Sequence, residues 1–191
     1  MRIFFRLVFE YCVLALAALG LTLTAMPVQA QQALTTTGGQ VELPDIIAGI
    51  IHYTRWPGNP GSIRLCLNEN DTDSASIAEH FELGYKDPPK VVAVVRRLQA
   101  DSGDKLIDCH VVYFGKVNAK ETSALLIQLG KHPILTIGHS EDFCSYSGLF
   151  CLVPQSSGYR IGANLDSISR NGLRVNPLLL KFTARDKRGA T

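Results

Sequence analysis

Short β-branched runs alternate with amphipathic helical segments along this chain, and this alternation restricts the fold more than any other sequence feature. Strands separated by helices are joined by right-handed crossovers into a parallel sheet with helices on its faces. The apolar segment 110–115, the helical segment 119–129 and the apolar run 133–138 form one such unit. They predict two parallel neighbouring strands and the helix that connects them.

Further elements are predicted on both sides of this unit. Apolar residues recur at helical spacing from Leu43 to Ile51, and this pattern stops at Trp56-Pro57 because proline disfavours helical geometry in the preceding residue. The valine-rich segment 90–96 is typical of a buried strand. We also expect a strand at 62–67, a helix at 74–83, strands at 148–153 and 159–163, a short helix capped by Asn164, and a last helix opened by Asn176-Pro177.

The overall fold class follows from the order of these elements. The turn-rich segment 154–158 lies between the last two strands and predicts a C-terminal hairpin, so the sheet should be mixed. No internal repeat or interdomain linker interrupts the chain. We therefore expect an α/β fold over residues 41–184: a single three-layer domain with a mixed, mostly parallel sheet flanked by helices.

The first 30 residues have the features of a signal peptide. Arg2 and Arg6 precede the apolar stretch 11–23, and Val28-Gln29-Ala30 suits cleavage before Gln31. The apolar stretch is shorter than the roughly 20 residues that span a bilayer as a helix. We expect export and cleavage of this leader, with a flexible N-terminal arm at 31–40 and a basic tail at 185–191.

Charge and motif content argue against several functional classes. The net charge of the whole chain is only +2 at pH 7, which disfavours a general nucleic-acid or anionic-lipid binder. The polar run from His139 to Asp142 gathers a base, a hydroxyl and carboxylates, but neighbours in sequence rarely form a catalytic triad. We therefore expect no enzymatic activity.

Four cysteines remain after the leader: Cys66, Cys109, Cys144 and Cys151. An even number of cysteines in an exported chain predicts disulfides. The chain has no Cys-x-x-Cys motif and its histidines are scattered, so we expect neither a metal site nor a cofactor. Three pairings are possible, and location favours Cys144 with Cys151, which flank a turn, leaving Cys66 with Cys109.

A group of arginines with one tryptophan is the best candidate binding site. Arginine and tryptophan are favoured at binding hot spots because they combine a broad surface with directional donors. The candidates are Arg55, Trp56, Arg170, Arg174 and Asn176. Trp56 could equally fill the core while Arg55 is solvated.

Several motifs, taken together and in order, resemble the YfiR family over about residues 43–182. They are Tyr53 to Pro57, Arg64 to Cys66, Cys109 with the Val-Tyr-Phe-Gly run after it, Cys144 to Cys151, and Asn164 to Pro177. The resemblance implies a periplasmic, non-enzymatic repressor of YfiN, an inner-membrane diguanylate cyclase, which lowers cyclic di-GMP and biofilm formation. It further implies sequestration by the outer-membrane lipoprotein YfiB, a homodimer, and the disulfides Cys66–Cys109 and Cys144–Cys151.

The resemblance also implies which residues contact partners. It places Arg55, Arg174 and Asn176 in a polar pocket or partner contact, and Ser145, Ile168 and Arg170 near the cyclase-binding face. By helical periodicity, Ile168 could equally face the core. Some relatives have an acidic residue at Gly162 and a histidine at Asn176.

The alternative function is a periplasmic small-ligand binding module. In this interpretation Arg55, Trp56 and Arg174 form an aromatic and cationic pocket for an anionic or aromatic molecule. A convergent pocket that holds these groups would favour ligand binding, whereas their dispersal over a flat face would favour protein contact.

Overall fold

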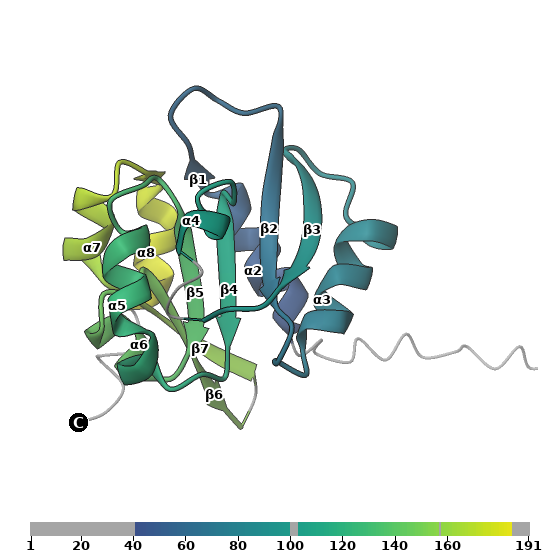
Figure 1. Cartoon of the computed structure of the whole chain (residues 1–191). Helices are drawn as coiled ribbons and strands as arrows, with labels where there is room; N and C mark the ends of the chain where they lie inside the picture. Colours follow the sequence, from purple (N-terminus) through teal and green to yellow (C-terminus); the bar gives the residue numbers. More distant parts are fainter. Residues whose placement is uncertain (1–40, 100–102, 157, 185–191) are drawn as a thin grey trace, which may run out of the picture. The chain divides into compact units, whose positions relative to one another are not determined.

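The computed structural model describes residues 41–99, 103–156 and 158–184, and a six-stranded sheet runs through it (Figure 1). The strand order is β3-β2-β4-β5-β6-β7. Neighbouring strands are parallel except for β6 and β7, which form an antiparallel hairpin. The predicted α/β fold with a mixed, mostly parallel sheet is confirmed. The predicted signal peptide, N-terminal arm and basic tail lie outside the described residues.

The strands and helices follow the predicted alternation closely. The six-stranded sheet consists of β2 (Ser62–Asn68), β3 (Lys90–Arg96), β4 (Val111–Gly115), β5 (Leu135–His139), β6 (Phe150–Gln155) and β7 (Gly158–Ala163). A separate antiparallel pair is formed by β1 (Thr54–Arg55) and β8 (Arg174–Val175). The helices are α2 (Leu43–His52), α3 (Ser74–Glu79), α4 (Gly103–Leu106), α5 (Ala119–Leu129), α6 (Glu141–Ser145), α7 (Leu165–Arg170) and α8 (Pro177–Ala184), with a π-helical turn η1 (His80–Gly84) after α3.

Two hydrophobic cores lie on opposite faces of the sheet. Because side chains alternate along a strand, Leu65 of β2 joins one core and its neighbour Cys66 joins the other. The first core contains buried side chains of α2, α3, α7 and α8, and the second contains those of α4, α5 and α6. In Figure 1, α4 lies in front of the sheet and α2 behind it. The expected three-layer arrangement is therefore present.

The helix predicted at 74–83 does not keep one geometry. α3 ends at Glu79, and the chain continues as the π-helical turn η1, in which the Tyr85 amide donates to the His80 carbonyl at 3.0 Å. A π-turn admits one extra residue per hydrogen-bonded ring and so changes the direction of the side chains that follow it. Hydrophobic periodicity over a short segment does not distinguish this from a regular α-helix.

The prediction that segment 90–96 is a buried strand is wrong. β3 is an edge strand of the sheet, paired along its length with β2 alone. Val91 is buried, but Val92 and Val95 are 43% and 50% exposed. A run of valines suits any half-buried pleated surface, and it does not encode the position of the strand in the sheet.

Both disulfides lie on the second core face, and both have the pairing that location favours. Cys66–Cys109 joins β2 to the segment before β4, with a Cα–Cα distance of 6.0 Å. Cys144–Cys151 joins α6 to β6, with a Cα–Cα distance of 5.6 Å. The first spans 43 positions in the sequence and the second only 7. The long disulfide therefore restricts the unfolded chain more than the short one does.

We predict that the Cys66→Ala/Cys109→Ala variant loses about 4 kcal/mol of unfolding free energy, and the Cys144→Ala/Cys151→Ala variant about 2.5 kcal/mol. Alanine avoids placing unpaired hydroxyls in the second core, where Cys66 is fully buried. Urea unfolding under non-reducing conditions measures both differences. A larger loss for the short disulfide than for the long one would contradict the assignment.

Candidate functional site

The short helix α6 is held in place by one fully buried aromatic side chain. Phe143 lies between Gly138 of β5 and Gly148 of the following turn. A Cβ atom at Gly138 would lie 2.5 Å from the Phe143 ring, and one at Gly148 would lie 2.3 Å from it. Both distances are far too short, so only glycine fits at either position. The ring and the Cys144–Cys151 disulfide together fix α6 against the sheet.

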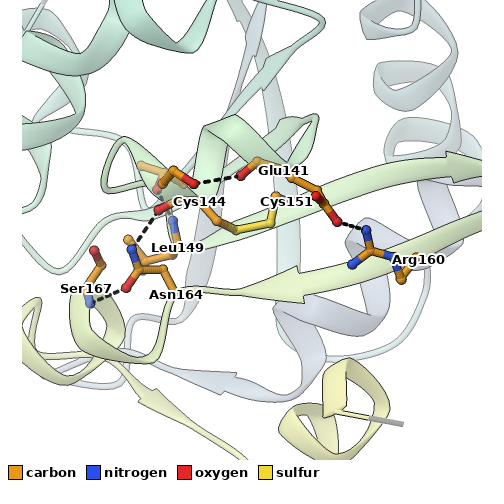
Figure 2. The surroundings of a disulfide bond; sticks show 9 residues. Glu141, Cys144, Leu149, Cys151, Arg160, Asn164 and Ser167 are labelled. Carbon is orange, nitrogen blue, oxygen red and sulfur yellow. Dashed lines mark hydrogen bonds and ion pairs between the residues drawn. A yellow bond between two sulfur atoms is a disulfide. The ribbon is translucent and has the colours of Figure 1, made fainter. Parts of the chain in front are cut away.

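The Asn164 side chain connects the disulfide loop to α7 (Figure 2). Its amide nitrogen donates to the Cys144 carbonyl at 2.7 Å, and its amide oxygen accepts from the Ser167 backbone N–H at 2.9 Å. The Asn164 backbone N–H also donates to the Leu149 carbonyl at 2.9 Å. The bond from the Ser167 N–H to the Asn164 oxygen is the N-cap of α7 that the sequence predicts. The bond to the Cys144 carbonyl was not predicted, because nothing in the sequence shows which carbonyl lies within reach of the Asn164 side chain.

The hairpin supports the same disulfide from its other side. Gly162 of β7 pairs with Cys151 of β6, and a Cβ atom at Gly162 would lie only 2.6 Å from the Cys151 sulfur. The Arg160 guanidinium forms an ion pair with the Glu141 carboxylate at the start of α6, as Figure 2 shows. Glycine at 162 thus lets the disulfide pack directly on β7.

The three residues expected near a cyclase-binding face occupy different environments. Ser145 is exposed on α6, and its hydroxyl lies 3.5 Å from the Glu141 carbonyl. Arg170 is exposed at the end of α7 and forms an ion pair with Asp166, with a hydrogen bond of 2.7 Å. Ile168 is only 8% exposed and belongs to the first core. Ser145 and Arg170 are therefore accessible to a partner, whereas Ile168 packs in the core.

Arg55, Trp56 and Arg174 line one hollow of about 480 Å³. Arg55 of β1 stands directly opposite Arg174 of β8 in the antiparallel pair. The loop after Trp56 and Gly172, which has a φ of +82°, complete the wall. Like charges opposite each other across a strand pair repel, so this arrangement is favourable for an anion between them.

Trp56 fills the core and also contributes to this hollow. It is 8% exposed, and its indole N–H donates to the His110 carbonyl at 3.1 Å. The Arg55 guanidinium donates to the carbonyls of His52 at 2.6 Å and Thr54 at 3.0 Å, which orients it beside the hollow. The interpretation of Trp56 as a core residue is therefore correct, and its role in binding stays a prediction.

Asn176 serves as a helix cap. Its side-chain oxygen accepts from the Leu178 backbone N–H at 2.9 Å, and its own N–H donates to the Tyr53 carbonyl at 2.8 Å. These bonds attach the start of α8 to the end of α2. Asn176 thus joins α8 to α2 near the hollow that Arg55, Trp56 and Arg174 line, which is called the arginine hollow below. Its side-chain oxygen is used by the helix cap.

The polar run from His139 to Asp142 does not converge on a reaction centre. His139 is buried, and its Nε2 lies 2.9 Å from the Tyr113 hydroxyl, while Ser140 is exposed. Burial lowers the pKa of His139, and burial raises the pKa of Tyr113. Across residues 41–99, 103–156 and 158–184, no three His, Cys, Asp or Glu side chains gather so as to hold a metal ion.

Within the same described ranges, every helix is too short or too polar to cross a bilayer. The described part of the molecule is an α/β domain with two disulfides. The YfiR/HmsC-like family matches the chain over residues 44–184, and the chain belongs to this family. The family comprises periplasmic regulators of diguanylate cyclase signalling and is regulatory, not catalytic. The resemblance found in the sequence is confirmed.

We predict that the stability of the domain falls as pH decreases below about 6.5. The unfolded chain binds a proton at His139 near the ordinary histidine pKa, whereas the folded chain resists it because burial lowers the pKa there. His110, whose pKa burial and Arg64 also lower, contributes in the same direction. Thermal unfolding across this pH range should show a weaker pH dependence for His139→Gln than for the parent chain, and equal slopes would contradict the prediction.

Proposed function

We propose that this protein is a non-enzymatic negative regulator that binds the periplasmic part of a YfiN-like membrane diguanylate cyclase and inhibits it. A YfiB-like outer-membrane lipoprotein relieves the inhibition, and the active regulator is a homodimer. Family membership supports the signalling context. The observation that carries the proposal is the link through Asn164, which makes the disulfide loop and α7 a single continuous surface unit.

Inhibition requires that the regulator prefer one state of the cyclase. A ligand shifts an equilibrium only by its difference in affinity for the two states. The face that carries Ser145 and Arg170 would bind the inactive arrangement of the periplasmic region and thereby withdraw it from the active population. Arg170, exposed and held by Asp166, is suited to a partner carboxylate because its guanidinium offers several further donors.

Arg170→Ala should weaken binding to the periplasmic region of the same organism's YfiN-like protein by at least about tenfold, because truncating an interface arginine that pairs with a partner carboxylate removes a charge-assisted hydrogen bond. The free energy of unfolding of the Arg170→Ala variant should change little, because an exposed ion pair within one helix contributes little to stability. Co-purification and titration under oxidising conditions measure the affinity. Lys120→Ala, which removes an exposed charge from α5, is the matched control. Equal affinity in both variants, or no complex with the parent chain, would overturn the proposal.

The Cys144→Ala/Cys151→Ala variant should repress the cyclase less than the parent chain does. Without the disulfide, α6 keeps the Phe143 ring and the ion pair with Arg160, but the Cys144 carbonyl that binds Asn164 becomes more mobile. Cyclase activity in reconstituted membranes reports the loss, and thermal unfolding shows whether the fold survives. Unchanged cyclase activity together with unchanged thermal stability would contradict a role of this disulfide loop in repression.

The second candidate function is a small-ligand module, favoured by the convergence of Arg55, Trp56 and Arg174 on one hollow. Trp56 is the only tryptophan in the chain, so its fluorescence reports directly on this hollow. Benzoate, an anionic aromatic probe, should change that fluorescence with saturation, and Arg174→Ala should weaken binding by about tenfold. A response that persists unchanged in Arg174→Ala would reject the hollow as the binding site.

A further inference from the structure

A second hollow lies between α2 and the segment from His80, at the start of η1, to Asp87. Its volume is about 420 Å³. One wall is formed by Asp45, Gly49 and His52, which share a face of α2, and the other by His80, Tyr85 and Asp87. None of these side chains lines the arginine hollow, and none belongs to the face that carries Ser145 and Arg170.

Acceptor groups dominate the lining. Asp45 and Asp87 supply two carboxylates and Lys86 supplies one ammonium, so the carboxylates outnumber the ammonium by one. The Asp45 carboxylate lies 3.7 Å from Nε2 of His80. This distance is too long for a direct hydrogen bond and leaves a position for a donor that bridges the two.

Ring faces accompany the carboxylates. The rings of His80 and Tyr85 lie 6.3 Å apart and are tilted by 37°. The Tyr85 hydroxyl is buried and has no hydrogen-bond partner among the described residues. Burial, with a contribution from Asp87, raises the pKa of Tyr85, so its phenol stays neutral. Aromatic faces beside carboxylates are the surroundings that organic cations prefer.

Two unusual features of the backbone border this hollow. The π-helical turn η1 ends directly before Tyr85, and π-turns are rare in proteins and frequent at functional sites. Gly49 lies in the middle of α2, where a Cβ atom would have no heavy atom within 4 Å. Glycine lowers helix stability by roughly 1 kcal/mol relative to alanine. The space above Gly49 would accept a methyl group, whereas a larger side chain there would occupy the hollow.

We propose that this hollow binds an organic ammonium ion, such as a primary amine or a polyamine. The ammonium group donates to the carboxylates of Asp45 and Asp87 and to His80, and its alkyl chain lies over Gly49 and the ring of Tyr85. The ligand is bound by shape and charge without any covalent step. This site is separate from the face that carries Ser145 and Arg170, so it stands or falls independently of cyclase inhibition.

Isothermal titration calorimetry of residues 31–191 with putrescine at low salt tests the proposal. We expect saturable binding that weakens by at least about tenfold in Asp45→Asn, because a charge-assisted hydrogen bond is lost. The control Asp142→Asn makes the same charge change on α6, in the opposite layer, and should leave the affinity unaltered. Succinate, a dianion of similar length, should not bind.

A pair of substitutions at Gly49 separates folding from binding. Gly49→Ala should raise the melting temperature and keep putrescine binding, since its methyl group meets open space. Gly49→Leu should fill the hollow and abolish binding. The proposal is overturned if the parent chain shows no saturable binding, if Asp45→Asn and Asp142→Asn bind equally well, or if succinate binds in place of putrescine.

Discussion

The face that carries Ser145 on α6 and Arg170 on α7 is held together by the side chain of Asn164. This single amide donates to the Cys144 carbonyl on α6 and accepts from the Ser167 N–H on α7. Only a side chain with both a donor and an acceptor at its end makes both bonds, so an ionised aspartate at this position could accept from Ser167 but could not donate to Cys144. Because α6 belongs to the second core and α7 to the first, Asn164 connects the two layers of the domain across the edge of the sheet.

The arginine hollow shows how one residue can serve both folding and binding. Trp56 is almost fully buried and bonded to the His110 carbonyl, yet its edge forms part of the wall beside Arg55 and Arg174. A buried anchor reduces the conformational entropy that ligand binding would otherwise remove. Arg55 and Arg174 are opposite each other in the β1–β8 pair, and two like charges in this register make the strand pair less stable than an uncharged pair would be.

The sequence predicts the elements well because alternating periodicities are local properties. It also predicts the caps at Asn164 and Asn176, where the residue type itself specifies the bond. Strand order is not local, which is why the valines of β3 suggested a buried strand although the strand lies at an edge. The two-residue strands β1 and β8 are too short for a periodic signal, so the opposition of Arg55 and Arg174 became visible only in the fold. The same holds for the pairing of His139 with Tyr113, two residues of a central strand pair.

A change at the short disulfide should therefore reach α6 before it reaches α7. Four contacts hold α6: the disulfide, the Phe143 ring between two glycines, the Asn164 bond and the ion pair between Glu141 and Arg160. α7 has independent support, because Ile168 is buried in the same core as Ile47 of α2. Loss of the disulfide removes one of four restraints on α6 and leaves the core packing of α7 in place. For a partner that contacts both Ser145 and Arg170, Ser145 would then be displaced while Arg170 stayed in place. A rigid partner loses affinity when it can no longer contact both residues at the same time.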